Sequence, residues 1–131
     1  MEKIKVFIAD DHQLFRDGIK YILSESEKFT TIGEASNGKE LLEKLERTEV
    51  DIILLDINMP VMNGWEFLDA VQEKHFRDKI FVAMVTSSIN SQDANTAQKY
   101  PQVIDYIEKP LRKEAFAHLW EKICRLKRCS K

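Results

Sequence analysis

The segment from Val50 to Leu55 is almost entirely apolar, and it limits the possible folds more than any other part of the chain. A strand with one wet face alternates apolar and polar residues, whereas a strand covered by helices on both faces is apolar nearly throughout. Other strand-like runs cover residues 4–9, 29–35, 79–85 and 103–107. Segments with helical spacing separate these runs. The alternation predicts a parallel sheet with helices on both faces, although periodicity leaves the strand order open.

Five helices are predicted between and after these strands: 13–24, one that begins at Asn37-Gly38, one that follows Gly64, 91–100, and 112–127. Asn37 is the expected N-cap of the second helix. The buried face predicted for the first helix consists of Leu14, Phe15, Ile19, Ile22 and Leu23. The buried face predicted for the last helix consists of Phe116, Leu119, Trp120, Ile123 and Leu126.

Composition places the chain among ordinary globular domains. Its 131 residues are enough for one domain with a real core. The net charge of −2 favours neither nucleic acid nor an anionic membrane as a partner. No run approaches the ~20 apolar residues that span a bilayer, and the N-terminus lacks the apolar core of a signal peptide. We therefore expect a cytoplasmic protein that binds no membrane and no nucleic acid directly.

Polar groups follow the apolar runs at the points where the strands are expected to end. Asp10 and Asp11 follow the first run and Asp56 follows the third, while Thr86-Ser87 and Lys109-Pro110 come after the last two. An Asp at a strand end is often only a helix cap or turn residue. Asp56, however, follows four aliphatic residues and is expected to be at least partly buried, so its carboxylate needs a partner.

If these strands are parallel, the three carboxylates share the edge where open α/β sheets bind ligands. Two unit charges ~4 Å apart at an effective dielectric of ~20 interact by about 4 kcal/mol, which here is repulsive. Mg²⁺ binds carboxylates together with waters and phosphate oxygens and would relieve this repulsion. The pattern therefore predicts a site for a divalent cation and a phosphoryl group.

These motifs together resemble a known family. They are Asp10-Asp11, the segment 54–60 with Asn63-Gly64, then 85–87, Tyr106 and Lys109-Pro110. The chain is similar to the receiver domains of two-component response regulators, in particular the chemotaxis-type (CheY-like) members, from Ile4 to about Leu126. The resemblance implies a flavodoxin-like, doubly wound α/β fold with five parallel strands in the order 2-1-3-4-5 and five helices.

The resemblance also bears on domain organisation. Residues 9–18 resemble receivers that precede a helix-turn-helix domain, whereas 58–60 and Lys109-Pro110 look more like stand-alone receivers. The basic end after the last helix, with Arg125, Lys127, Arg128 and Lys131, is too short for a DNA-binding module. We expect a single receiver domain over residues 1–131, with its core at 4–127 and no output domain.

The resemblance implies a role for each residue at the sheet edge. Asp56 would be the phosphoacceptor. Mg²⁺, for which Mn²⁺ is expected to substitute, would be held by Asp11, Asp56 and the backbone carbonyl of Asn58, with Asp10 acting through a water. Lys109 and Thr86 would contact the phosphoryl oxygens. Ser87, found where many receivers carry Gly or Ala, would add a further contact.

Further roles concern signalling and phosphoryl lifetime. Thr86 and Tyr106 would form the switch pair, Asn58 and Ser88 would tune dephosphorylation, and the Lys109-Pro110 peptide bond would be cis. Phosphorylation by a histidine kinase or phosphotransfer protein would change a face formed by the fourth helix, fifth strand and fifth helix, which would bind a downstream protein. Residues predicted on this face are Ile89, Asn90, Gln98, Tyr106, Glu108, Lys113 and Ala117. The protein would be a monomer or a phosphorylation-dependent dimer.

We expect a switch rather than an enzyme, one that catalyses its own phosphotransfer and slow dephosphorylation. Two alternatives remain at this point. A Mg²⁺-dependent phosphohydrolase would need a general acid two residues after its nucleophile, where this chain has Asn58. A receiver-like module that binds partners without phosphate would have no use for the acidic residues and Lys109. His12, His75 and His118 are expected at surface positions outside any cluster.

Overall fold

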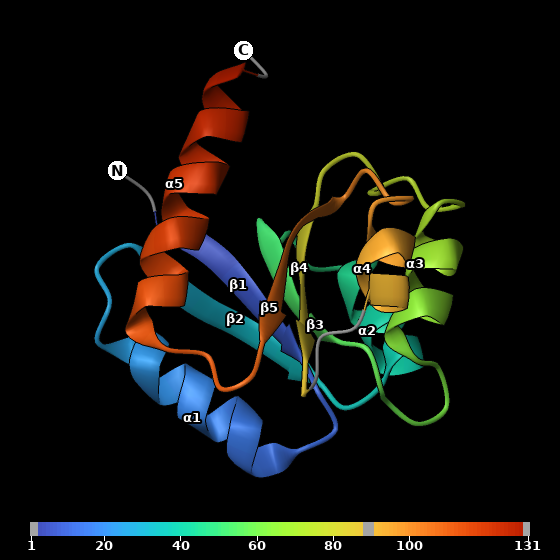
Figure 1. Cartoon of the computed structure of the whole chain (residues 1–131), viewed down its shortest axis with the longest axis horizontal. Coiled ribbons are helices and arrows are strands. Elements are labelled where there is room, and N and C mark those ends of the chain that lie inside the picture. Colours follow the sequence, from blue (N-terminus) through green and yellow to red (C-terminus); the bar gives the residue numbers. More distant parts are fainter. Residues whose placement is uncertain (1–2, 88–90, 130–131) are drawn as a thin grey trace.

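The five strands are all parallel and lie in the order β2-β1-β3-β4-β5 in the computed structural model, which describes residues 3–87 and 91–129 (Figure 1). Their order along the chain, with the helices, is β1 (Ile4–Ala9), α1 (Gln13–Ser24), β2 (Phe29–Ala35), α2 (Gly38–Leu45), β3 (Ile52–Asp56), α3 (Gly64–Val71), β4 (Phe81–Thr86), α4 (Ser91–Ala97), β5 (Val103–Glu108) and α5 (Lys113–Cys129). The predicted fold class and strand order are confirmed.

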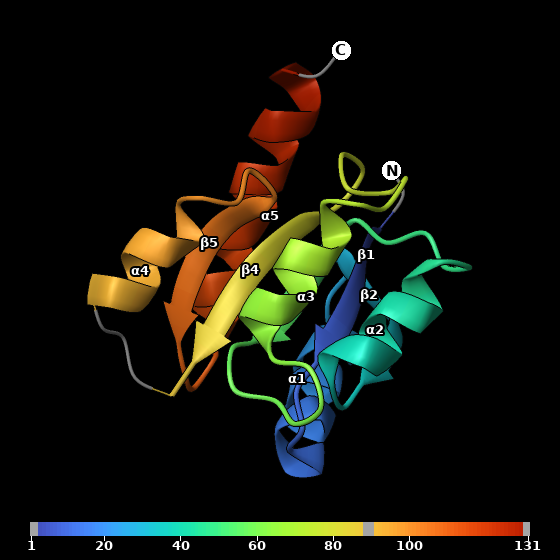
Figure 2. The same ribbon diagram turned by 90° about the vertical axis from the view of Figure 1, so that its right-hand side faces the viewer.

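Two apolar layers cover the sheet, and β3 lies between them. Its Ile53 and Leu55 side chains pack into the layer beneath α2 and α3, whereas Ile52 and Leu54 pack into the layer beneath α1 and α5. All five residues of β3 are buried. Figure 2 looks onto α2, α3 and α4 and shows α5 behind the sheet. The continuous apolar run at β3 therefore has the cause that was predicted for it, namely helices on both faces.

Two leucines that were predicted to be buried are exposed. Leu14 of α1 is 87% exposed, because it lies five positions before buried Ile19 and so about 140° away from it around the helix. Leu126 of α5 is 39% exposed, because the last turns of this helix extend beyond the sheet (Figure 1). Both predictions were wrong for local reasons, and the helices themselves occur where they were expected.

The fourth helix is shorter than predicted and ends at Ala97 instead of Tyr100. Pro101 disfavours helical backbone at the residue before it, and the Tyr100 amide bonds to the Ala97 carbonyl in a turn. The Tyr100 ring stacks on Trp65 of α3, with 6.1 Å between the ring centroids. Its hydroxyl donates to Asp69 at 2.6 Å. These contacts tie the end of α4 to α3.

Candidate phosphoacceptor and metal site

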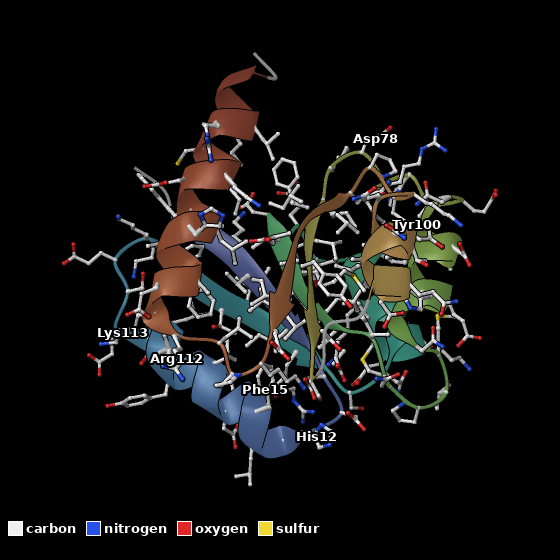
Figure 3. The ribbon with its side chains drawn as sticks, viewed as in Figure 1. His12, Phe15, Asp78, Tyr100, Arg112 and Lys113 are labelled. Atoms are coloured by element: carbon white, nitrogen blue, oxygen red, sulfur yellow. The ribbon has the colours of Figure 1, made fainter. Side chains whose placement is uncertain are left out.

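Carboxylates from the ends of two neighbouring strands meet at one edge of the sheet. Asp56 is the last residue of β3, and Asp10 and Asp11 directly follow β1, which pairs with β3. One ligand atom from each of these residues and from His12 lies within 4.8 Å of all the others. In Figure 3 His12 marks this lower edge of the molecule, whereas Asp78 marks the opposite edge. We call Asp10, Asp11 and Asp56 the acidic cluster.

One lysine side chain reaches the acidic cluster from the far end of the chain. Lys109 follows β5, and its Nζ lies 2.7 Å from Asp10 Oδ2 and 3.8 Å from Asp56 Oδ1. Its backbone amide donates to the Thr86 carbonyl at 2.7 Å, which ties the end of β4 to the end of β5. The peptide bond from Lys109 to Pro110 is cis, the geometry that the resemblance implied. The convergence expected from the sequence is therefore present.

Asp56 is a buried carboxyl group whose pKa is raised by its surroundings. The residue is only 4% exposed. Burial is the main cause that raises its pKa to about 6, and the neighbouring charges of Asp10 and Asp11 add to the effect. The Lys109 charge and a hydrogen bond from the Asn58 backbone act in the opposite direction without cancelling it. The single ammonium therefore does not neutralise the cluster, which leaves the site suited to a further cation.

The loop after β3 is held close to the acidic cluster by the start of α3. Asn63 and Glu66 form a capping box at the first turn of this helix. The Gly64 amide donates to the Ile57 carbonyl at 2.9 Å. A Cβ at Gly64 would lie 2.8 Å from the Asp56 carbonyl oxygen, so only glycine permits this approach. Asn63, which caps α3, and Gly64, which permits the close approach, thus help to position the backbone of Asp56, the proposed phosphoacceptor.

The structure adds two residues that the sequence analysis did not place at the site. His12 was expected outside any cluster, but its Nδ1 lies 3.2 Å from Asp10 Oδ1 and 3.1 Å from Asp11 Oδ1. Its position directly after the two acids was the available signal. Phe15 was predicted only as a core residue, yet its ring lies 4.3 Å from Lys109 Nζ in a cation–π contact (labelled in Figure 3). This tertiary contact left no signal in the local sequence.

The remaining predicted site residues differ in burial and position. Thr86 is buried at the end of β4, and the next residue, Ser87, is exposed. Asn58, two residues after the end of β3, is also exposed. Tyr106 is half-buried on β5 and packs against the apolar layer beneath α2 and α3. Ser88, Ile89 and Asn90 lie outside the described residues. The other residues predicted on the signalling face, Gln98, Glu108, Lys113 and Ala117, are all exposed.

Among residues 3–87 and 91–129, no helix has both the length and the apolar character needed to cross a bilayer. This agrees with the composition of the chain, which contains no long apolar run.

A comparison with protein families finds one family whose model matches most of the chain. The model of the response regulator receiver domain matches residues 6–121. The chain therefore belongs to the response regulator receiver domain family. Members of this family bind Mg²⁺ at an acidic site, and the acidic cluster is the matching feature here.

Curated relatives share this domain within longer proteins. The nitrate/nitrite response regulator protein NarL of Escherichia coli K12 is 41% identical over 98 residues, which are 75% of this chain and 44% of NarL. A protein-glutamate methylesterase/protein-glutamine glutaminase of Geobacillus kaustophilus is 39% identical over 112 residues, which are 84% of this chain and 31% of the enzyme. The chain thus spans less than half the length of each.

Solved structures match over nearly the whole chain. A two-component response regulator from Cytophaga hutchinsonii has a TM-score of 0.86 and 27% identity, and the match covers 95% of this chain and 99% of that one. The receiver (REC) domain of AraT from Geobacillus stearothermophilus has a TM-score of 0.82 and 29% identity, covering 99% and 100%. A CheX-CheY-BeF3-Mg complex from Borrelia burgdorferi matches with a TM-score of 0.78 and 27% identity, covering 88% and 84%.

Proposed function

We propose that this receiver domain accepts a phosphoryl group on Asp56 from the phosphohistidine of a histidine kinase or phosphotransfer protein. The observation that carries the proposal is the convergence of the acidic cluster with Lys109 at one edge of the sheet. In the transfer, a carboxylate oxygen of Asp56 forms a bond to phosphorus and the phosphorus–nitrogen bond of the donor breaks. The electron pair of that bond stays on the histidine nitrogen, which takes up a proton.

The residues around Asp56 have distinct tasks in this reaction. The Lys109 ammonium, already 3.8 Å from Asp56, neutralises oxygens of the arriving phosphoryl group. The Asn58 backbone bond orients the Asp56 carboxylate. Thr86 and Ser87 provide hydroxyl groups near the end of β4 for further phosphoryl contacts. Ser88, outside the described residues, and Asn58 set how easily water reaches the phosphorus.

The donor set of the acidic cluster fits Mg²⁺. Carboxylate and carbonyl oxygens are the ligands that Mg²⁺ prefers, and the one Lys109 charge beside the three carboxylates leaves negative charge to be neutralised. Asp11, Asp56 and the Asn58 carbonyl would hold the ion, with Asp10 acting through a water, and Mn²⁺ would substitute. When bound, the ion supplies positive charge to phosphoryl oxygens. The similar CheX-CheY complex from Borrelia burgdorferi, which contains both BeF3 and Mg, supports this assignment.

The output is a shift in conformational population. Phosphorylation favours the state in which the Thr86 hydroxyl turns toward the phosphoryl group and the Tyr106 ring turns inward. The exposed face of α4, β5 and α5 then binds a downstream protein or a second copy of the chain. The half-buried position of Tyr106, between the apolar layer and this face, suits such a movement.

An NMR titration with beryllofluoride and Mg²⁺ tests the proposal. We expect amide shifts at Thr86 and Tyr106 in the wild type and none in Asp56→Asn. The control is Asp51→Asn, which alters a carboxylate at the opposite end of β3 and should respond as the wild type does. Absence of a response in the wild type, or a full response in Asp56→Asn, contradicts the proposal.

Two further measurements separate the alternatives. A phosphohydrolase would turn over a generic phosphomonoester well above the rate of Asp56→Ala, whereas we expect no difference because Asn58 is no general acid. A phosphate-independent module would bind its partner equally well before and after phosphorylation, whereas we expect the affinity to change.

A further inference from the structure

Arg16 is a buried charged residue that the proposed reaction does not use. It belongs to α1, is 9% exposed, and its guanidinium turns back toward the loop that carries the acidic cluster. Nη1 donates to the Asp10 backbone carbonyl at 2.6 Å and Nε donates to Glu34 of β2 at 2.7 Å. Nη2 donates to Gln13 at 2.7 Å. All three nitrogens of the guanidinium are therefore held.

The contact with Asp10 concerns the peptide group between two residues of the acidic cluster. The Asp10 carbonyl and the Asp11 amide belong to one planar peptide unit, so fixing the carbonyl fixes the direction in which the chain enters Asp11. On its other side, the Asp10 amide donates to the Ala35 carbonyl of β2 at 3.0 Å. Arg16 and β2 together determine the backbone around Asp10.

Asp11 depends on this backbone more than Asp10 does. The Asp10 carboxylate is 1% exposed. It forms an ion pair with Lys109 at 2.7 Å and accepts a hydrogen bond from the His12 backbone amide at 2.8 Å. The Asp11 carboxylate is 31% exposed, and it pairs with a His12 side chain that is itself 69% exposed. An exposed histidine holds a carboxylate less firmly than buried partners do, so we expect the orientation of the peptide plane to decide where the Asp11 carboxylate lies.

We infer that Arg16 is a positioning residue for the metal site, which fixes the peptide plane between Asp10 and Asp11 and thereby directs the Asp11 carboxylate toward Asp56. The inference rests on the proposed function, in which Asp11 and Asp56 hold Mg²⁺. Groups that orient metal ligands in this way commonly change metal affinity about 10–100-fold when they are removed.

Lys20 provides a matched control. Lys20 lies one turn after Arg16 in α1. Its Nζ lies 2.6 Å from the other carboxylate oxygen of Glu34 and 3.3 Å from Asp17. Lys20 and Arg16 thus share Glu34 and the same pair of elements, α1 and β2. Only Arg16 also donates to the Asp10 carbonyl. Replacing each by Met keeps most of the side-chain stem and removes the charge.

The test is the Mg²⁺ dissociation constant of the wild type, R16M, R16K and K20M, measured by calorimetry together with urea unfolding. We expect R16M to weaken Mg²⁺ binding about tenfold and K20M by no more than about twofold. Residual dipolar couplings should report a new orientation of the Asp11 amide in R16M and an unchanged one in K20M. Repeating the titrations in sucrose, which favours the folded state, guards against partial unfolding of R16M.

Mg²⁺ binding by the wild type tests the proposed function, and the comparison with R16M tests the role of Arg16. A wild type that binds no Mg²⁺ contradicts the proposed function itself. A wild type that binds Mg²⁺ while R16M binds it equally well overturns only the role of Arg16. R16K keeps the charge but cannot hold Glu34 and the Asp10 carbonyl with a rigid fork, so we expect a loss of at least about threefold. Wild-type affinity in R16K would show that charge alone suffices and would overturn the inference.

Discussion

Lys109 and Asp10, 99 positions apart in the chain, form an ion pair with 2.7 Å between Nζ and Oδ2. The pair is asymmetric with respect to the proposed phosphoacceptor, because the same ammonium lies 3.8 Å from Asp56. Lys109 is the only lysine that we find at the acidic cluster among the described residues, and it is paired more closely with Asp10 than with Asp56. Asp56 remains partly uncompensated, which agrees with its raised pKa.

The first prediction is that Asp56→Asn stabilises the metal-free protein at pH 7. The pKa of Asp56 rises from 3.8 to about 6 on folding, so between these values the folded protein holds a proton that the unfolded chain has released. Stability then falls as the pH rises through this window, by at most about 3 kcal/mol. Asn cannot ionise, so the variant should be more stable above pH 6 and similar to the wild type below pH 4.

Urea unfolding of both proteins at pH 4, 5, 6, 7 and 8, without divalent cations, measures this difference. Asp51→Asn is the control, because the Asp51 carboxylate accepts a hydrogen bond from the Lys5 amide at 2.7 Å and pairs with Lys127. Its removal should bring no gain in stability at any pH. A loss of stability in Asp56→Asn at pH 7 would mean that the carboxylate is a structural partner.

The sequence pattern was sufficient for the parallel sheet and for the edge at which the acidic residues and Lys109 meet, whereas the strand order came from the family resemblance. Parallel strands bring their carboxyl ends to one edge, so Asp10, Asp56 and Lys109 had to converge once the strands were identified. Burial of Asp56 followed from the aliphatic run before it. Phe15 could not be placed over Lys109, because that contact depends on how α1 packs across the sheet. Leu14 is apolar but lies about 140° around α1 from buried Ile19, so apolar character alone did not predict its exposure.

The second prediction concerns Lys109→Met. Loss of the ammonium removes the 2.7 Å ion pair between Lys109 and the buried Asp10 carboxylate, so we expect a loss of about 3 kcal/mol in the free energy of unfolding at pH 7. The pKa of Asp56 should rise further, because the Lys109 charge is what lowers it most. Carboxyl ¹³C NMR over a pH series measures that pKa, and urea unfolding measures the stability.

Lys122→Met is the matched control for Lys109→Met. Lys122 pairs with Asp105 at 3.4 Å and donates to the Ile104 carbonyl, near the start of β5 and at a more exposed position than Lys109, which follows the end of this strand. We expect a loss of no more than about 1 kcal/mol and no change in the pKa of Asp56. Equal effects of the two substitutions would show that Lys109 acts only as a general structural cation.

The third prediction compares two glycines. A Cβ at Gly64 would lie 2.8 Å from the Asp56 carbonyl oxygen and 3.1 Å from the Ile57 Cα, and both are backbone atoms that cannot turn aside. Gly64→Ala must therefore separate the start of α3 from the end of β3, at a cost of about 1–3 kcal/mol. Since this displacement includes the backbone of Asp56, the variant should also be phosphorylated more slowly by acetyl phosphate.

Gly18→Ala should have the opposite effect on stability. Gly18 lies inside α1, and a Cβ there meets nothing within 4 Å. Alanine in a helix is favoured over glycine by about 1 kcal/mol, partly because it restricts the unfolded chain. Thermal or urea unfolding measures both variants, and phosphorylation of Gly18→Ala should match that of the wild type. A Gly64→Ala protein as stable as Gly18→Ala would mean that α3 can move away from β3 freely, and the close approach would then have no part in positioning Asp56.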